Sequence, residues 1–590
     1  MKQFFKFMFA SMLGTVLLMV ISGIICMAML FTIISASQTE QSPVKKNSVL
    51  VMKLNERIYD RTSNNPFENI DFNTMKSNAS PGLGDILDEI KYAATDDRIK
   101  GIYLELSSIN AGMATVEEIR NALLEFKKSG KFIVAYSEAY SQTAYYLATT
   151  ADQIYVNPEG MVEFKGLSAQ LLFLKGLMEK IEVQPQIIRH GKYKSAIEPL
   201  ISDKMSPANR EQTTKYIMSL WDQMLKGISS TRKLEVATLN MLADSLSVTS
   251  GHSALKYKLV DAVKYKDEVL DELRTLLAIE KDDDISFISL TKYNKAISHD
   301  KSEYSRNKIA VVYAQGDIVG GDGDSKTIGS EKVSMAIRQA RQDSSVKAIV
   351  LRINSPGGSA LASEVIWREV TLAAKVKPVV ASMGDLAASG GYYIACAATK
   401  IVASPNTITG SIGVFGVVPN LENLFKNKLG VTFDGVSTNK HSDHISVFRP
   451  MDKYETAVVQ NDVENTYNTF ITHVAEGRKM TVAEVDSIGQ GRVWSGTDAK
   501  NIGLIDDFGG LTEAIKLAAT LAKLEKYKVV DYPKQKDPFV QFIEQLSGEE
   551  TTSALLEKEL GTTYTIYQQA KSVTEMKGVQ ARMPYEIILY

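Results

Sequence analysis

The sequence has only two cysteines among its 590 residues, Cys26 and Cys396. Cys26 lies in a long apolar run and Cys396 in a segment predicted to be buried, so the two cannot build a disulfide framework. The stability of the fold must therefore come from packing. The low cysteine content leaves the compartment open, because a protein of an oxidising space can simply avoid the residue.

Net charge is also low, at −2 near neutral pH. Binding nucleic acid needs a concentrated excess of Lys and Arg to neutralise phosphates, so nucleic acid is not an expected partner. The sequence contains no His-Glu-x-x-His motif, no paired-cysteine motif and no phosphate-binding Gly-Lys-Ser/Thr loop. We therefore expect neither a metal ion nor a nucleotide cofactor.

Charged residues are absent from one long segment near the N-terminus, from Phe7 to Ser35. As a helix rising ~1.5 Å per residue, this segment is long enough to cross the ~30 Å hydrocarbon core of a bilayer. A cleaved signal peptide is the alternative, although its apolar stretch usually has only ~7–15 residues. Lys2 and Lys6 precede the segment, and the positive-inside rule then places most of the chain outside the cytoplasm. Lys45 and Lys46 follow the segment and weaken the prediction of that orientation.

The chain contains one pattern twice, at an offset of about 247 residues. Each copy predicts a strand, a helix and a second strand, and similar residues continue in the same order beyond them. Tyr145–Ala148 falls on Tyr392–Ala395 in this alignment. The predicted strand, helix and strand cover residues 102–108, 115–128 and 132–135 in the first copy and 349–355, 363–375 and 379–382 in the second.

Strands that alternate with helices imply parallel pairing through right-handed crossovers, and so an α/β architecture. Apolar strands at Val49–Met52 and Ile309–Val312 open the two copies, and a polar stretch from about residue 280 to 307 separates them. The length also exceeds what a single core usually supports. We predict an anchor and linker at residues 1–48, a first α/β domain at 49–300 and a second at 301–590, which includes a tail from Glu549.

The two copies differ at the end of the predicted strand at residues 102–108 and of its counterpart at 349–355. The second copy has the sequence Asn-Ser-Pro-Gly-Gly-Ser at 354–359, whereas residues 107–111 of the first copy contain no glycine. Gly357 and Gly358 permit positive φ and a close approach of the backbone, which an oxyanion hole made of amide N–H groups requires. A tight strand-to-helix turn is the alternative interpretation.

A second difference concerns Ser389, which stands just before a predicted helix and is followed by two glycines. Amide groups at the start of a helix favour negative charge, so this serine is a candidate nucleophile. Gln142 occupies the matching position of the first copy. The alternative is that Ser389 serves only as an N-cap.

A serine nucleophile needs a base within hydrogen-bond reach. No histidine lies between Ser389 and His441, but the first copy contains Lys194, and we expect the aligned residues 438–442 of the second copy to hold no match for it. A lysine acts as a base only when neutral, so burial must lower its pKa by about 3 units from ~10.4. A solvated surface lysine is one alternative, and His190 as the base is another.

Together these motifs resemble the signal peptide peptidase A family, also called protease IV, in its long, duplicated bacterial form. The resemblance covers nearly the whole chain, because it includes the N-terminal apolar segment and motifs from both copies. The motifs that carry it stand at residues 193–199, 354–358, 388–392, 409–416 and 491–496.

This resemblance implies tandem crotonase/ClpP-like domains and a serine protease with a Ser/Lys dyad. Ser389 would be the nucleophile and Lys194 the general base, contributed by the first copy. The resemblance also implies that Ser411 hydrogen-bonds the lysine, and that the amides of Gly358 and Gly390 form the oxyanion hole. For Ser411, a turn residue in a Gly-rich connection is the alternative.

The resemblance further implies a homotetramer in the bacterial inner membrane, with a single span and the catalytic domains on the periplasmic side. Its substrates would be cleaved signal peptides. Two other functions stay open at the level of the sequence. One is a crotonase-like acyl-CoA hydratase or isomerase, and the other is a non-catalytic membrane scaffold.

Overall fold

The computed structural model describes residues 2–39, 43–64, 70–71, 76–77, 81–297, 305–324, 326–535, 579–583 and 588–589. Part of the predicted linker and most of the predicted tail lie outside these residues, as does the side chain of Cys26. Cys396 is fully buried, as the sequence predicted. Residues 298–304 also lie outside the described part of the chain, so a domain boundary at residues 300 and 301 stays a prediction.

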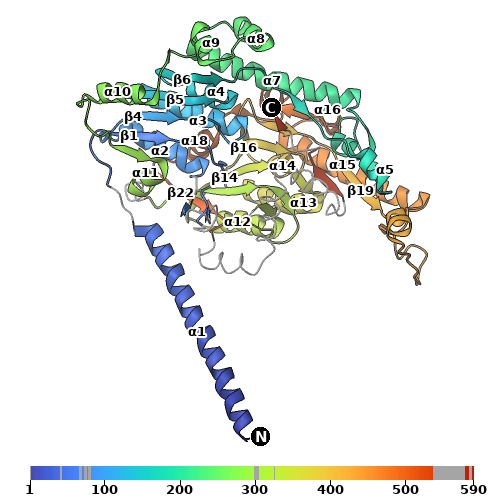
Figure 1. The fold of residues 1–590 in the computed structure, drawn as a ribbon. Coiled ribbons are helices and arrows are strands. Elements are labelled where there is room, and N and C mark those ends of the chain that lie inside the picture. The colour runs from blue at the N-terminus through green and yellow to red at the C-terminus, as the bar shows by residue number, and fades with distance from the viewer. Residues whose placement is uncertain are drawn as a thin grey trace.

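The N-terminal helix α1 (Lys2–Thr39) projects away from the body of the molecule (Figure 1). Within it, Gln3–Ile25 is long and apolar enough to cross a membrane, and none of this stretch is buried against the protein. A signal sequence meets the same criteria of length and composition. The absence of packing leaves the apolar side chains of this stretch without a protein partner to cover them.

The first copy forms a six-stranded sheet in which all neighbouring strands are parallel. Its order is β10-β1-β4-β5-β6-β9. The strands are β1 (Ser48–Met52), β4 (Ile99–Glu105), β5 (Phe132–Tyr140), β6 (Gln153–Val162), β9 (Ala262–Val263) and β10 (Phe287–Ser289).

The second copy repeats this topology. Its strands pair in parallel in the order β22-β11-β14-β16-β17-β21, which places each strand where its counterpart lies in the first sheet. The duplication predicted from the sequence is therefore present in the fold. The strands are β11 (Lys308–Gln315), β14 (Val346–Ser355), β16 (Val379–Ala388), β17 (Lys400–Ala403), β21 (Asp507–Phe508) and β22 (Lys528–Tyr532).

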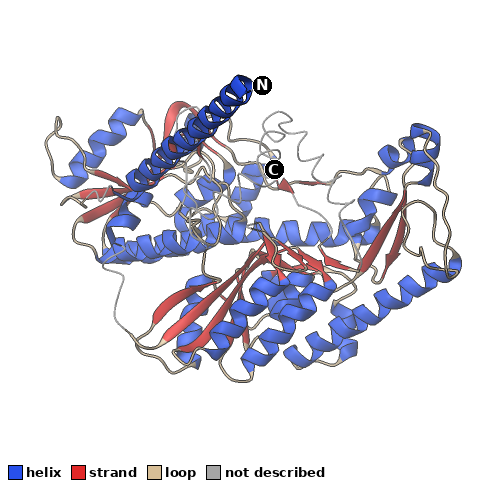
Figure 2. Ribbon diagram, turned by 90° about the horizontal axis from the view of Figure 1, so that it is seen from below, coloured by secondary structure: helices blue, strands red, loops and turns tan. Residues whose placement is uncertain are grey.

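Parallel sheets are covered on both faces, which explains why a central strand such as β14 is buried along almost its whole length. Seen from below, helices lie on both sides of the strands (Figure 2). The helices also repeat, because α7 (Pro207–Arg232) and α15 (Lys453–Arg478) each contain 26 residues. Ser206 caps α7 by accepting a hydrogen bond from Asn209 N, and Asp452 caps α15 in the same way.

A further sheet joins the two copies. Strand β8 (Gln184–Arg189) of the first copy pairs antiparallel with β19 (Phe415–Asn420) of the second over six residues. The same sheet includes β15 (Gly357–Ser359) and β23 (Gln580–Arg582), a piece of the C-terminal tail. Because β8 is held against the second copy, the residues that follow it are also brought there.

The two copies also share a core and a buried ionic cluster. One apolar cluster contains Ile102 from the first sheet and Val350 from the second. The Arg352 guanidinium is fully buried and forms ion pairs of 2.8 Å with both Asp60 and Glu118 of the first copy. These contacts fix the position of one copy against the other.

Candidate active site

Ser389 stands at the junction between β16 and the short helix α14 (Gly390–Ala395). Its φ is +55° and its ψ is −113°, a conformation that residues other than glycine rarely adopt. The side chain is fully buried and forms no capping hydrogen bond to α14. The N-cap alternative is therefore not supported, because the hydroxyl has another partner.

That partner is Lys194, which follows β8 and precedes a short 3₁₀ turn, Ser195–Ile197. Its amine Nζ lies 2.9 Å from Ser389 Oγ. The Lys194 side chain is fully buried, which excludes the alternative of a solvated surface lysine. The fold thus brings together two residues that are 195 positions apart in the sequence.

Burial lowers the pKa of Lys194 well below its ordinary value of 10.5. No carboxylate in the described part of the chain is among the causes of this shift, so no negative charge offsets the cost of burying a positive one. The neutral amine is therefore favoured in the folded protein.

This shift predicts that the stability of the protein depends on pH. The unfolded chain restores the ordinary pKa of Lys194, so below pH 10.5 folding has to remove a proton from the amine and loses stability. We expect Lys194→Met, which has no titrating group, to melt at a higher temperature than the wild type at pH 7. The difference should shrink as the pH approaches 10.5. Thermal melting at pH 7 and pH 10 measures this, and a lower melting temperature for Lys194→Met at pH 7 would contradict the shift.

Ser411 provides the other contacts of the lysine. Nζ of Lys194 lies 3.1 Å from Ser411 Oγ and 3.2 Å from the Ser411 carbonyl oxygen. Ser411 is fully buried, has a φ of +49°, and donates its own N–H to the Arg492 carbonyl at 2.7 Å. The serine is therefore placed where it can orient the amine toward Ser389.

Gln212, which the sequence did not single out, holds the backbone around Lys194. From the first turns of α7, its Nε2 donates to the Tyr193 carbonyl at 3.1 Å and to Ser195 Oγ at 2.8 Å. Its Oε1 accepts from Val493 N at 3.1 Å. Gln212 thus links both neighbours of Lys194 to the second copy. A fully buried glutamine is a signal that only the structure reveals.

The glycines of the second copy lie against the residue that follows Ser389. Gly357 and Gly358 have φ of +100° and +154°, so the expectation of positive φ is confirmed. A methyl group on Gly357 would lie 2.7 Å from the Gly390 nitrogen, a contact too close for any side chain. The two backbone segments that carry the predicted oxyanion hole are therefore in contact, and Gly358 and Gly390 are both buried.

The matching place in the first copy is filled by Gln142. Its Oε1 accepts hydrogen bonds from Lys165 N and Gly166 N, and its Nε2 donates to the Gly166 carbonyl. A side-chain amide that is fully engaged with the backbone has no nucleophile to offer. At this position the first copy therefore has a structural residue and no nucleophile.

His190 and Lys440 test the assignment of the base. His190 Nδ1 lies 2.6 Å from Glu464 Oε2, and its ring stacks on Tyr467 at 3.8 Å, whereas Lys194 contacts Ser389.

The second copy also has a lysine at the position of Lys194. Counted back from the N-caps of α7 and α15, Lys440 stands where Lys194 stands in the first copy. The expectation that the second copy has no matching residue is therefore wrong. The difference is that the Lys440 side chain is exposed.

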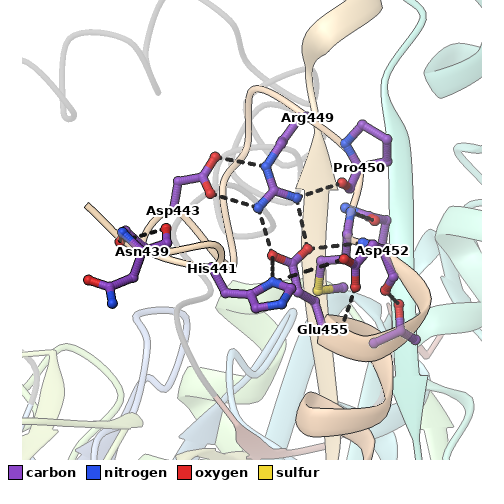
Figure 3. Close-up of polar contacts among 11 residues, drawn as sticks. Asn439, His441, Asp443, Arg449, Pro450, Asp452 and Glu455 are labelled. Atoms are coloured by element: carbon purple, nitrogen blue, oxygen red, sulfur yellow. Dashed lines mark hydrogen bonds and ion pairs between the residues drawn. The ribbon is translucent and has the colours of Figure 1, made fainter. Parts of the chain in front are cut away.

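Among the described residues, His441, Asp452 and Glu455 have donor atoms close enough to hold a metal ion. Figure 3 shows that Arg449 already occupies this cluster, because its guanidinium binds both Asp443 and Glu455. These bonds lower the pKa of Glu455 and keep its carboxylate ionised. The geometry is that of an ion-pair network.

Comparison with known proteins decides the family. The model of peptidase family S49 matches the chain twice, at residues 125–280 and 371–525, which together are more than half of it. The chain belongs to peptidase family S49. It is a serine protease of this family, and one of the two matches falls in each copy. A model of Clp protease also matches residues 301–409, in agreement with a crotonase/ClpP-like fold.

Curated relatives match the S49 chain over most of its length. It is 39% identical to Protease 4 of Salmonella typhi over 79% of this chain and 76% of that one. Protease 4 of Haemophilus influenzae is 37% identical over 74% and 72% of the two chains. The chloroplastic serine protease SPPA of Arabidopsis thaliana is 34% identical over 92% of this chain and 78% of that one.

Proposed function

We propose that this chain is an endopeptidase with a Ser/Lys dyad, in which a second domain at residues 301–590 carries the nucleophile Ser389 and a first domain at 49–300 carries the base Lys194. The observation that carries the proposal is the 2.9 Å contact between the two side chains in a fully buried setting. Such a pair is the minimum that serine acyl transfer requires.

The dyad works only with a neutral lysine, which the lowered pKa of Lys194 supplies. The neutral amine has a lone pair and accepts the proton of the Ser389 hydroxyl as the oxygen attacks a peptide carbonyl. The resulting ammonium donates this proton to the leaving amine, and water then hydrolyses the acyl-enzyme through the same steps in reverse. Ser411 keeps the amine pointing at Ser389 throughout, because it contacts Nζ through two oxygens.

Negative charge develops on the carbonyl oxygen of the substrate during the attack, and hydrogen-bond donors that are already in place stabilise it. The amides of Gly358 and Gly390 supply them in this proposal. Their support is that the two segments touch and that residues 357, 358 and 389 all hold positive φ. Positive φ turns an amide away from the direction it has in a regular strand, which allows it to face the site.

The substrates we propose are apolar peptides, above all cleaved signal peptides, bound as extended strands. Residues 580–582 pair antiparallel with β15 and β19, so the edges of these two strands accept an extended chain. The α1 helix anchors the enzyme in a bacterial inner membrane as a single span, with the domains on the periplasmic side. Anchoring brings the site close to peptides that lie in the bilayer, which raises their effective concentration. The assembly in this proposal is a homotetramer.

Peptide hydrolysis and thioester chemistry are distinguished by one comparison. Full-length protein in detergent is assayed with a fluorogenic apolar peptide and with an acyl-CoA thioester. We expect hydrolysis of the peptide, and a loss of it in Ser389→Ala of at least about 10³-fold, because the variant lacks the oxygen that attacks the carbonyl.

Ser334→Ala is the matched control, because this serine is also buried in the second copy and its hydroxyl has no hydrogen-bond partner among the described residues. It should retain most of the peptidase activity. Thioester turnover that is unchanged in Ser389→Ala, with no peptide hydrolysis in the wild type, would favour a crotonase-like hydratase or isomerase. Absence of both activities would favour the scaffold.

A further inference from the structure

The segment Gly491–Trp494 of the second copy lies against the backbone of Lys194. Gly491 has a φ of +79°, and a methyl group on it would lie 2.7 Å from the nitrogen, Cα and Cβ of Lys194. Its N–H donates to the carbonyl of Ile412 at 2.7 Å, one residue after Ser411. A residue with a side chain would not fit between these backbones. The segment is thus fixed beside both the base and the residue that orients it.

The backbone of Arg492 holds Ser411 in place. Its carbonyl accepts the Ser411 N–H at 2.7 Å. Gly410, which precedes Ser411, accepts the N–H of Ser389 at 2.8 Å. A movement of Arg492 would therefore displace the two oxygen atoms that contact Lys194 Nζ, together with the backbone that meets the nucleophile.

The side chain of Arg492 reaches the first copy and packs against two aromatic rings. Its guanidinium carbon lies 4.6 Å from the centroid of the Tyr193 ring and 4.5 Å from that of Trp494. Its Nη1 donates to the Tyr193 hydroxyl at 3.1 Å, and its Nη2 forms an ion pair of 2.8 Å with Glu211 of α7. Because Tyr193 directly precedes Lys194, one side chain joins the second copy to the neighbour of the base.

The contact between Arg492 and the two rings depends more on stacking than on the ion pair. The Arg492 side chain is 16% exposed, but that of Glu211 is 53% exposed, so water and salt weaken their attraction. A planar guanidinium packs flat against aromatic rings, whereas the ammonium of a lysine is a compact and strongly hydrated charge. Lysine is therefore not an equivalent residue at this position.

Among the described groups, burial alone lowers the pKa of Lys194, and the charge of Arg492 is not among the causes. Nζ of Lys194 contacts Ser389 and Ser411, and it lies 5.9 Å from the centroid of the Phe415 ring. None of these three residues carries a charge. Arg492 therefore acts on the base through its position and through the exclusion of water.

We propose that Arg492 is a positioning residue of the dyad, which keeps the amine of Lys194 directed at Ser389 across the boundary between the two copies. This inference rests on the proposed dyad. The main chain of Arg492 holds Ser411, and its side chain holds Tyr193. Because it acts through these two neighbours, its loss should lower the rate of the chemical step more than the binding of peptide.

Arg492→Met tests this in the full-length protein, because methionine fills much of the space without stacking as a planar cation or bonding the Tyr193 hydroxyl. We expect kcat for the fluorogenic peptide to fall about 10- to 100-fold, the effect of a small misplacement of a catalytic group, while KM changes by less than about 2-fold. The acid limb of the kcat/KM profile should also move to higher pH. Water that reaches a loosened Lys194 raises its pKa back toward 10.5, so the amine becomes protonated at a higher pH.

Arg478→Met is the matched control, because Arg478 also belongs to the second copy and pairs with a carboxylate, Asp506, at 2.8 Å. Its kcat and its acid limb should stay those of the wild type, even if its melting temperature falls. Arg492→Lys is a second variant, which keeps a charge beside Glu211 but loses the planar contact with the rings. We expect it to lower kcat several-fold, so the inference stays testable if Arg492→Met does not fold.

A wild-type kcat in either Arg492 variant, or an unmoved acid limb in Arg492→Met, would overturn the inference. A rise in KM alone would also overturn it, because it would assign Arg492 to the binding of peptide. Equal losses of kcat in Arg492→Met and Arg478→Met would overturn it as well, since general stability would then explain both. Failure of the proposed function looks different, because the wild type itself would then show no Ser389-dependent hydrolysis.

Discussion

Lys194→Ala is expected to lower kcat/KM for peptide hydrolysis by about 10²–10⁴-fold, the range that a general base contributes. The amine is the group that contacts Ser389 Oγ, and the pocket around it is closed to solvent. Water therefore has no ready access to replace it. The alanine variant should still fold, because it removes a group whose burial disfavours its charged form.

His190→Ala is the matched control for this prediction. The histidine stands four residues before the lysine, but its ring is engaged by Glu464 and Tyr467. We expect this variant to keep most of its activity. The assay compares kcat and KM of both variants with the wild type, after thermal melting has shown that each is folded. Loss of activity in His190→Ala together with retention in Lys194→Ala would assign the base to the histidine.

Arg352→Met is expected to destabilise the protein by about 3–5 kcal/mol, the usual cost of removing one partner of a buried ion pair. Burial by itself would lower the pKa of Arg352, but the Asp60 and Glu118 carboxylates outweigh it and keep the guanidinium charged. Without the arginine, these two carboxylates remain buried without a cation. Because both belong to the first copy, the variant should also loosen the contact that brings Lys194 to Ser389, and lose activity below its melting temperature.

Arg338→Met is the matched control. Arg338 also pairs with a glutamate, Glu369, at 2.7 Å, but its side chain is 52% exposed. Exposed ion pairs contribute ~0–1 kcal/mol, so the melting temperature should change little. Thermal melting and the peptidase assay on both variants measure the difference. Equal effects of the two substitutions would show that the buried cluster does not hold the copies together.

Much of the fold could be predicted because the two copies repeat one pattern. The predicted strands at residues 132–135 and 379–382 are the first four residues of β5 and β16. The predicted strand at 102–108 begins three residues later than β4, because Lys100 and Gly101 interrupt the apolar pattern after Ile99. The sheet that joins the copies was not predicted, since its strands are short and their partners are distant in the sequence.

The residues of the candidate site could also be predicted only in part. Ser389 could be singled out because Gln142 stands at the matching position of the first copy. Lys194 was predicted because it was expected to lack a counterpart, whereas the feature that distinguishes it from Lys440 is burial, which the sequence does not show.

Gln212 and Arg352 could not be singled out, because a polar residue within a helix or strand looks solvated until its burial is known. The tail segment at 579–583 could not either, because it pairs with β15 of the second copy and packs against α7 of the first, contacts that depend on how the two copies fold together.

The most direct test of the dyad is to locate the adduct of a fluorophosphonate, which reacts with activated serine hydroxyls. Full-length wild type, Lys194→Ala and His190→Ala are treated at neutral pH, and the modified residue is identified by peptide mass spectrometry. The account predicts an adduct on Ser389 in the wild type and in His190→Ala, and almost none in Lys194→Ala. An adduct on another serine, or equal labelling of Ser389 with and without Lys194, would contradict it.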